Sequence, residues 1–380
     1  MRRLFPLLFI ACSTSSIPDA SLTLDARASV PDAGAPDADP APDAVGAPDA
    51  DPPDGGDPEA YRAAILGATW TRLANAPAIR GKQDDVFFVD PQEGFSVNGE
   101  GRIFHTVDGG DQWERLVERP GTFFRSILML GRERGFAGNI GTGYFPGVTD
   151  SSPLFETRDG RTWTVVDRIT GPAVTGICNM HRLDDQHLFA VGRVGGPCFM
   201  ITSSDGGESW RSRDLNGVLS MLIDVRFTSP TDGLIVGQDS EARCKILRTR
   251  DGGETWSAVF QSRIPQTLCW KISFPSEAVG YVSIQGGSRS TFAKTTDGGD
   301  TWEELTLLPG RAFRGLGAGF ITEDIGWMAN EVGAWRTTDG GATWEQDASL
   351  GPAINRFRFV DRHTAYAIGT TIYKLSVPRQ

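Results

Sequence analysis

Short hydrophobic segments recur at regular intervals along most of the chain. Residues 86–88 (Val-Phe-Phe) precede a glycine-led run at 94–97 (Gly-Phe-Ser-Val), and the same order returns at 225–227 and 233–237. Runs of this length, rich in β-branched and aromatic residues and bounded by turn residues, predict β-strands. Each unit is predicted to contain four strands, a to d, which together make one sheet. The first strands of the seven units are expected to end near Phe88, Met129, Met180, Phe227, Phe274, Phe320 and Phe359.

Six copies of one polar motif lie between the predicted strands c and d. The motif reads Ser/Thr-x-Asp, then glycine, then Trp, and its aspartates are separated by 51, 46, 46, 46 and 42 residues. This spacing is typical of propellers and solenoids. The motif resembles the Asp-box, or BNR repeat, although the second copy is one residue shorter between Asp159 and Trp163 and is expected to form a distorted turn. The repeated aspartates are Asp108, Asp159, Asp205, Asp251, Asp297 and Asp339.

The residue types of the motif indicate a structural turn rather than a reactive site. An aspartate accepts hydrogen bonds from nearby backbone N–H groups, and glycine adopts the positive φ that a tight hairpin needs. The tryptophan is expected to bury its ring between neighbouring sheets. Catalytic or Ca²⁺-binding roles for these aspartates are the alternative, but function is sought first among the residues that do not repeat.

The two ends of the folded region complement each other. Residues 355–375 supply strands a, b and c without a motif, while residues 67–73 contain Trp70 and read as the end of a motif followed by strand d. Joining them completes a seventh unit and leaves no sheet edge exposed. The sequence therefore predicts an all-β fold: a single seven-bladed β-propeller over residues 61–380, with four strands per blade, closed by its N- and C-terminal segments.

The N-terminal residues predict export. Arg2 and Arg3 precede an apolar run that is too short to span a bilayer and ends at Cys12. Residues 9–12 (Phe-Ile-Ala-Cys) resemble a bacterial lipobox, which implies that residues 1–12 are a signal segment and that Cys12 is lipidated. Simple secretion and a misplaced start are the alternatives. Residues 13–60 repeat Pro-Asp-Ala units and predict a disordered spacer, so the expected location is the cell envelope, as an outer-membrane lipoprotein or a secreted protein.

The charge of the chain argues against nucleic acid as a partner. The net charge is −11, but residues 17–60 carry eleven acidic side chains against Arg27, and Arg2 and Arg3 add +2, so residues 61–380 carry −3. A nearly neutral fold has no basic field for nucleic acid, and contact with a membrane is expected through the lipid anchor only.

Four cysteines lie inside the predicted propeller. Exported proteins usually oxidise such thiols, and the pairing that is local in sequence joins Cys178 to Cys198 and Cys244 to Cys269, one of three possible connectivities. Four free buried thiols are the alternative. The four histidines are scattered and no Cys-x-x-Cys occurs, so neither a metal nor a cofactor is expected.

Asp-box blades behind an export signal resemble the photosystem II stability and assembly factor family, with matches along residues 67–375. The resemblance implies a non-catalytic docking platform for a partner polypeptide, often through an arginine-rich surface. It does not carry over the photosystem partner, because nothing in this sequence indicates a photosynthetic host. The same motif also occurs in sialidases, other glycosidases and sortilin-type receptors, so the motif specifies fold more than activity.

A carbohydrate-active protein, either a sialidase-like or other glycoside hydrolase or a lectin, is the alternative function. A sialidase needs a nucleophilic tyrosine and three arginines, yet Tyr281 and Tyr366 occupy the strand b slot that is filled by other aromatics elsewhere. A glycosidase that uses two carboxylates stays open, because Asp150, Asp239 and Glu241 lie in loops outside the repeat.

Any ligand is expected at the loops opposite the Asp-box hairpins, where the b–c and d–a connections converge. Residues 138–152 depart most from the repeat and contain Tyr144 and Phe145, which are expected to form an exposed aromatic pair for protein or sugar; a loop without a ligand is the alternative. Arginines on this face are predicted to form a carboxylate-binding arc, with solvated and unrelated arginines as the alternative. They are Arg125, Arg193, Arg243, Arg263, Arg289 and Arg314.

Overall fold

The computed structural model describes residues 57–379 apart from residues 82 and 311–313. The predicted signal segment, the lipidation of Cys12 and the predicted spacer up to residue 56 lie outside the described residues. Among the described helices there is none with the length and apolar character that a bilayer crossing requires.

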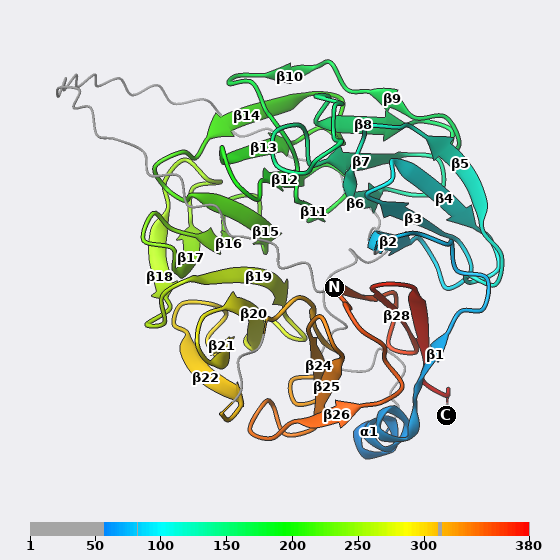
Figure 1. Cartoon of the computed structure of the whole chain (residues 1–380), viewed down its shortest axis with the longest axis vertical. Coiled ribbons are helices and arrows are strands. Elements are labelled where there is room, and N and C mark those ends of the chain that lie inside the picture. The colour runs from blue at the N-terminus through cyan, green and yellow to red at the C-terminus, as the bar shows by residue number, and fades with distance from the viewer. Residues whose placement is uncertain (1–56, 82, 311–313, 380) are drawn as a thin grey trace, which may run out of the picture. The chain divides into compact units, whose positions relative to one another are not determined.

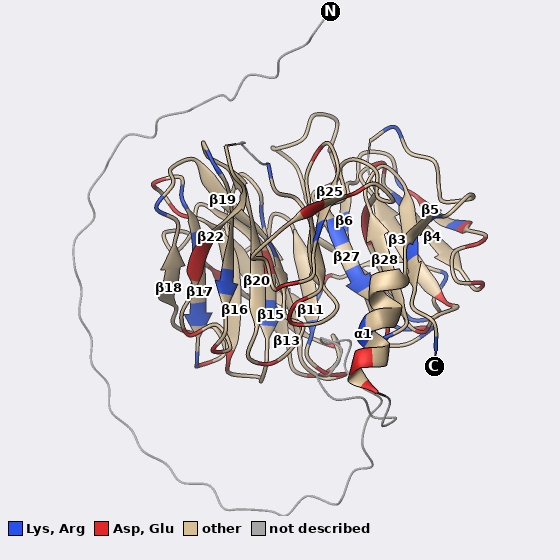
Figure 2. Ribbon diagram, turned by 90° about the horizontal axis from the view of Figure 1, so that it is seen from below, with Lys and Arg blue, Asp and Glu red and all other residues tan. Residues whose placement is uncertain are grey.

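Seven sheets, numbered here as blades 1 to 7, surround a central axis in the described part of the chain (Figure 1). The sequence-based prediction of a seven-bladed propeller is confirmed. In blade 1 the first strand is innermost and each later strand pairs antiparallel on its outer side, and blades 2, 4, 5 and 6 keep this order. Figure 2 shows the blades from the side, with connecting loops at two opposite faces.

Blades 1 to 3 contain strands β2 (Gln83–Phe88), β3 (Gly94–Asn98), β4 (Arg102–Thr106), β5 (Glu114–Glu118), β6 (Phe124–Met129), β7 (Gly135–Asn139), β8 (Leu154–Thr157), β9 (Thr164–Val165), β10 (Ile169–Thr170), β11 (Asn179–Arg182), β12 (Leu188–Gly192), β13 (Phe199–Ser203) and β14 (Trp210–Asp214). Blades 4 and 5 contain β15 (Met221–Phe227), β16 (Gly233–Gln238), β17 (Cys244–Thr249), β18 (Ser257–Gln261), β19 (Thr267–Ser273), β20 (Gly280–Gly286), β21 (Ser290–Thr295) and β22 (Glu303–Leu308). Blades 6 and 7 contain β23 (Ala318–Phe320), β24 (Gly326–Ala329), β25 (Ala334–Thr337), β26 (Glu345–Asp347), β27 (Arg356–Phe359), β28 (Thr364–Ile368), β29 (Ile372–Ser376) and β1 (Trp70–Arg72).

Blade 7 is built from both ends of the folded region, as predicted. Strand β1 pairs antiparallel with β29, so that Trp70 lies opposite Leu375 and Arg72 opposite Tyr373. The Trp70 ring packs edge-on against Trp327 of blade 6 at 5.3 Å between ring centroids. The propeller is therefore closed by hydrogen bonds between residues that are about 300 positions apart.

A short helix, α1 (Pro58–Gly67), precedes the closing strand and was not expected from the sequence. The Asp57 side chain accepts a hydrogen bond from the Glu59 N–H and thereby caps the helix, while Pro58 suits its first turn. Arg62 forms an ion pair with Asp324 of blade 6. The helix therefore begins three residues before the boundary at 61 that composition indicated.

Blade 3 carries five strands instead of four. The added strand, β10, runs parallel to the outermost strand β14, with Ile169 opposite Trp210. The outer strand of blade 2, β9, is only two residues long. The chain leaves blade 2 after it, and residues 169–170 pair with the outer edge of blade 3 as β10. This blade follows the shortened second Asp-box, which is where the sequence predicted an irregular turn.

The Asp-boxes form the same hydrogen-bonded turn in five of six copies. In the fourth copy, Asp251 accepts from the Thr255 N–H at 2.9 Å and from the Thr249 hydroxyl at 2.8 Å, and the Gly253 N–H donates to Thr249. In the shortened second copy, Asp159 instead accepts from the N–H groups of Arg161 and Thr162 at 2.8 and 2.7 Å. The carboxylates thus serve their own turns, as the sequence predicted.

These turns make a testable prediction about acid stability. The Thr255 and Thr301 side chains and backbones hold the pKa values of Asp251 and Asp297 at about 2, below the ordinary value of 3.8. The unfolded chain therefore binds more protons in this range, and the stability from these carboxylates is complete above about pH 4 and lost as the pH falls towards 2. Urea unfolding between pH 2 and 6 measures this slope. We expect the stability of an Asp251→Asn/Asp297→Asn variant to change less steeply with pH than that of the original chain. The control Glu345→Gln, on the exposed edge strand β26, should keep the pH dependence of the original chain. The same pH dependence in all three proteins would contradict the assignment.

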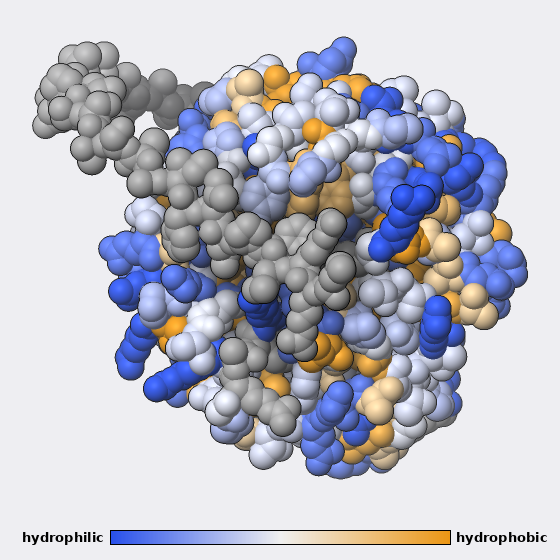
Figure 3. Space-filling model, in the orientation of Figure 1, coloured by the Kyte–Doolittle hydropathy of each residue, from blue (hydrophilic) through white to orange (hydrophobic). Residues whose placement is uncertain are grey.

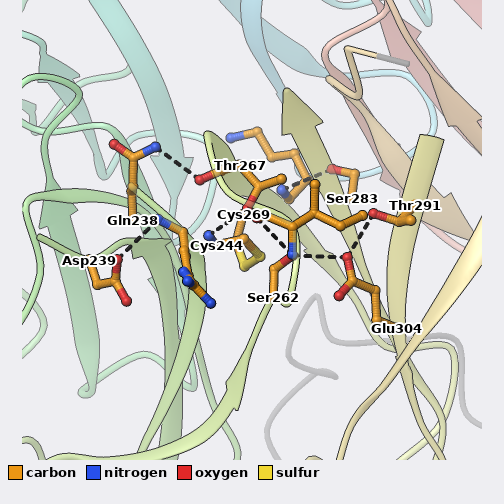
Figure 4. Close-up of a disulfide and its surroundings, with 12 residues drawn as sticks. Gln238, Asp239, Cys244, Ser262, Thr267, Cys269, Ser283, Thr291 and Glu304 are labelled. Atoms are coloured by element: carbon orange, nitrogen blue, oxygen red, sulfur yellow. Dashed lines mark hydrogen bonds between the residues drawn. A yellow bond between two sulfur atoms is a disulfide. The ribbon is translucent and has the colours of Figure 1, made fainter. Parts of the chain in front are cut away.

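One of the two predicted disulfides is present. Cys244, at the start of β17, bonds to Cys269 of β19 in the next blade, with 4.6 Å between their Cα atoms (Figure 4). Cys178 and Cys198 are free and buried, so the predicted second bond is not found. The reason is topological: Cys178 precedes the innermost strand of blade 3 and Cys198 precedes its third strand, and strand β12 lies between them.

Candidate functional site

The loop face, defined by the b–c and d–a connections, gathers three exposed arginines around blade 5. Arg263 lies between β18 and β19, Arg289 between β20 and β21, and Arg314 between β22 and β23. Arg314 forms an isolated bridge with Gln285, and the Gly287 N–H donates to the Gln266 carbonyl at 2.8 Å, so these loops contact one another. No ion pair joins the three guanidinium groups to any described carboxylate.

Hydrophilic side chains stand out over this blade in the space-filling view, at the position that β19 to β22 occupy in Figure 1 (Figure 3). Three positive charges without acidic partners form a surface that attracts carboxylates. We call Arg263, Arg289 and Arg314 the arginine surface.

The other three predicted arginines do not join this surface. Arg125 is buried, forms an ion pair with Asp84 and lies over the Trp270 ring at 5.3 Å. Arg193 is buried and donates to the carbonyl oxygens of Gly196, Ile140 and Thr142. Arg243 is partly buried, with its Nε 3.6 Å from Glu241. The predicted arc of six is therefore corrected to three, because Arg125 and Arg193 are buried and Arg243 is partly buried beside Glu241.

Of the predicted aromatic pair, Tyr144 is exposed and Phe145 is partly buried. Phe145 is partly buried and packs against Phe123 at 4.7 Å between centroids, so it contributes to the interior. Tyr144 keeps 45% of its surface exposed and lies against Gly195, where the lack of a side chain leaves room for its ring. Tyr144 is the member of the pair that remains available to a ligand.

An apolar cluster fills the central channel at the loop face. Its members come from blades 2 to 6, at the starts of the innermost strands and the ends of the second strands. They are Ile140, Cys178, Val194, Ile223, Leu268, Trp270 and Leu316. We call this cluster the plug. The plug is buried, and its members from β15 and β19 precede the cavity-lining residues of the same strands.

Below the plug, charged side chains line the channel. Asp85 accepts from the N–H groups of Val86 at 2.9 Å and of Ile127 in the next blade at 3.1 Å, and also binds Arg358 through Nε at 3.1 Å. Burial alone would raise the pKa of Asp85, but Arg356 and Arg358 outweigh it and lower the pKa below 3.8. Asp85 thereby joins blades 7, 1 and 2.

Asp224 repeats this arrangement in blade 4. It accepts from the Val225 N–H at 2.9 Å and from the Ile272 N–H of blade 5 at 3.0 Å, and the Asn179 amide of blade 3 also donates to it. Arg356 spans the channel to donate to the Asn179 side chain at 2.6 Å. This polar layer was not predicted from the sequence. The sequence does contain a signal for it, because each hydrophobic segment concerned carries a charged residue three positions before its final aromatic residue. These charged residues are Asp85, Asp224, Lys271 and Arg356.

A cavity of about 150 Å³ lies in this half of the channel, towards the Asp-box face. It is lined by the later residues of the innermost strands, including His181, Arg226, Lys271 and Arg358. The sequence placed the site at the loop face; the structure also provides a polar, partly open pocket towards the opposite end.

The loop carboxylates that a glycosidase would need are engaged in local structure. Burial would raise the pKa of Asp150, but the Thr122 hydroxyl, the Ser152 N–H and Arg119 lower it below 3.8, which is opposite to what a general acid requires. Asp239 accepts from the N–H groups of Glu241 and Arg243 in its own turn. Among the described residues there is also no group of three or more His, Cys, Asp or Glu side chains that would hold a metal ion.

The tyrosines of strand b are structural. The Tyr281 hydroxyl donates to the Glu323 carbonyl at 2.6 Å and the Tyr366 hydroxyl to the Gly109 carbonyl at 3.0 Å. Burial raises the pKa of both hydroxyls above 10, so neither is activated as a nucleophile. Their rings stack on those of the next blade, as Tyr281 does on Phe320 at 3.5 Å.

Comparison with known proteins finds one family profile, which matches less than half of the chain. The family profile described as "Photosynthesis system II assembly factor YCF48" matches residues 215–364. The chain is similar to this family over that segment. No curated protein matches the sequence.

Solved propellers resemble the whole described fold. A structure of YCF48 bound to D1 peptide is 18% identical, with a TM-score of 0.61 over 82% of this chain and 97% of that one. YCF48 from Cyanidioschyzon merolae is 17% identical, with a TM-score of 0.61 over 81% and 99%. A GH74 enzyme from Niastella koreensis is 16% identical, with a TM-score of 0.56 over 80% of this chain and 53% of that one. At these identities the likeness establishes the fold.

Proposed function

We propose that this chain is a non-catalytic docking propeller that binds an acidic segment of a partner polypeptide on the arginine surface. The observation that carries the proposal is that Arg263, Arg289 and Arg314 lie exposed on adjoining loops and their guanidinium groups form no ion pair with a described carboxylate. The Glu304 carboxylate accepts from the Arg263 backbone N–H at 3.1 Å, which leaves the guanidinium without an ion pair. Planar guanidinium groups recognise carboxylates through paired hydrogen bonds, and an unpaired group loses none of its own contacts when it does so.

Two further observations support docking. The family whose profile matches residues 215–364 is an assembly factor family, and one structural relative is described as bound to a peptide. The matched segment contains all three arginines, so the similarity covers the proposed surface. Tyr144 adds an exposed aromatic ring to the same face, which suits contact with a peptide.

The carbohydrate alternative has weaker support. The GH74 relative shares the fold over about half of its own length, and the loop carboxylates Asp150 and Asp239 are held by turns. The proposed envelope location and the tether at Cys12 stay predictions of the sequence, because that residue lies outside the described part.

Charge reversal of the arginine surface tests the proposal. We expect an Arg263→Glu/Arg289→Glu/Arg314→Glu variant to bind an acidic decapeptide at least about tenfold more weakly than the original chain, because three attractive contacts become repulsive. Fluorescence anisotropy of the labelled peptide measures the affinity, and raising the salt concentration should weaken binding to the original chain.

The matched control makes the same change in net charge elsewhere. Arg115, Arg132 and Arg211 are exposed arginines that already pair with glutamates outside the loop face. The Arg115→Glu/Arg132→Glu/Arg211→Glu variant should keep peptide affinity within about twofold, since exposed pairs of this kind contribute little. Equal weakening in both variants would show that net charge, not the arginine surface, binds the peptide.

A further inference from the structure

The channel cavity contains a buried amine without a partner. Lys271 of β19 lines the cavity and is 4% exposed, yet its ammonium group makes no hydrogen bond or ion pair with any described residue. Its backbone N–H is satisfied separately by the Ser283 hydroxyl at 3.1 Å. A charged group that is taken out of water without a partner is strongly disfavoured. The pocket therefore lacks a group that would complete it.

Neighbouring carboxylates do not supply that group. The Asp224 carboxylate accepts hydrogen bonds from the N–H groups of Val225 and Ile272 and from the Asn179 amide. All three donors are neutral. Asp85 is occupied by Arg356 and Arg358. Neither carboxylate lies within ion-pair distance of Lys271.

The charges around the cavity leave a positive excess. Four side chains that can carry a positive charge line it, with Asp224 in the lining and Asp85 beside Arg356. Glu277 and Asp232 form no ion pair with Arg226, but their charges oppose the lowering of its pKa by burial. The four cations are Arg226, Lys271, Arg356 and Arg358. His181 adds no charge at neutral pH, because burial and then Arg226 lower its pKa to about 4. Once Lys271 is protonated, the four cations of the lining outnumber the carboxylates Asp224 and Asp85 by two.

Arg226 is the second cation without a carboxylate. Its guanidinium lies 4.2 Å from the centroid of the Phe274 ring, and no described carboxylate is within ion-pair distance. Its place near the end of β15 puts it at the side of the cavity towards the Asp-box face. An anion that enters from this face would meet Arg226 first and Lys271 deeper in the channel.

We propose that the channel cavity is a binding site for a small carboxylate, which Lys271 and the neighbouring guanidinium groups hold. A cavity of about 150 Å³ has room for on the order of five water molecules, which is enough for an ion such as acetate or malonate or for the end of a peptide. The cavity lining shares no residue with the arginine surface, so the proposal does not depend on the docking function.

Binding should be coupled to proton uptake. Burial, followed by the positive charge of Arg356, lowers the pKa of Lys271 well below 10.5, and Arg125 acts in the same direction. Asp224 and Asp85 oppose these effects without cancelling them. A bound carboxylate favours the ammonium form, so the amine takes up a proton as the ligand enters.

Isothermal titration calorimetry of the full chain with sodium malonate tests the proposal. At constant ionic strength in sodium chloride, we expect saturable binding whose heat differs between two buffers of unlike ionisation enthalpy, because a proton is taken up. Lys271→Met should weaken binding at least about tenfold, whereas Lys245→Met, outside the pocket on β17, should leave it unchanged. Lys271→Arg retains the charge and should retain binding.

The stability of the variant provides a second measurement. Without malonate, Lys271→Met should unfold at the same or a higher urea concentration than the original chain, because it removes an unpaired buried amine. A lower midpoint would mean that Lys271 already has a stabilising partner and would overturn the proposal, as would malonate affinity that Lys271→Met does not change. The absence of binding tighter than about 10 mM would overturn it as well.

Two further titrations identify the source of the carboxylate. A tripeptide with a free carboxyl end should bind if chain ends are the natural ligand, and its amidated form should not; malonate binding without tripeptide binding points to a small molecule. Inorganic phosphate that binds more tightly than malonate would overturn the choice of carboxylate.

Discussion

Replacing Trp70 with alanine is expected to lower the free energy of unfolding by about 3–5 kcal/mol, which is a large part of the stability of a typical domain. Trp70 is 4% exposed and lies between Trp327 of blade 6 and Phe357 of blade 7, with centroids at 5.3 and 5.6 Å. It also belongs to the strand that pairs with β29, so its loss opens the ring where the two chain ends meet. Urea unfolding measures the change.

Trp256→Ala provides the matched control. Trp256 is the partly buried tryptophan of the fourth Asp-box and lies within a blade whose strands are continuous in sequence. Both variants should be destabilised, but limited proteolysis should release the segment that contains α1 in Trp70→Ala alone. If Trp70→Ala resists the protease as well as Trp256→Ala does, ring closure does not depend on Trp70.

Asp85→Asn is expected to cost about 3–5 kcal/mol of stability, because it leaves the buried Arg356 and the partly buried Arg358 without their anion. The Asp85 carboxylate is fully buried, accepts from the Arg358 guanidinium at 3.1 and 2.9 Å, and lies 3.2 Å from the Nε of Arg356. The asparagine keeps the size of the side chain, so the measured loss in urea unfolding reports on charge rather than on packing.

Asp224→Asn is the natural comparison, since Asp224 occupies the same position of blade 4 but pairs with neutral donors. Its loss should be smaller, about 1–2 kcal/mol, in line with hydrogen bonds that are not part of an ion pair. An equal loss at both positions would show that the arginines of blade 7 do not depend on Asp85.

The repeat and the fold could be predicted because the information is local. In five of the six boxes, a hydroxyl, an aspartate and a glycine form the hydrogen bonds of one turn, as Thr249, Asp251 and Gly253 do. Because these partners are close in sequence, the motif itself predicts the turn. Closure was also visible, because a unit without a box at one end and a Trp70 strand at the other leave few alternatives. The shortened box around Asp159 correctly indicated a distorted turn, but not the fifth strand of the next blade.

The site could be predicted in part. Arg263, Arg289 and Arg314 were identified as residues of the loop face, and their exposure follows from their place in connections. Arg125 and Arg193 were placed with them, although burial and partners in other blades remove both from the surface. The channel pocket was not predicted, because its charged residues lie within segments whose hydrophobic pattern predicts buried strands.

The sequence by itself determined the strand repeat, the chemistry of the turns and the closing of the ring, since each depends on residues close in the chain or on a simple count of units. Tertiary structure decided which cysteines pair, which arginines stay exposed and where Lys271 is left without a partner. Contacts such as Arg356 with Asn179 join residues 177 positions apart across the channel. Such contacts depend on how seven sheets converge on one axis, and no local pattern encodes which side chains meet there.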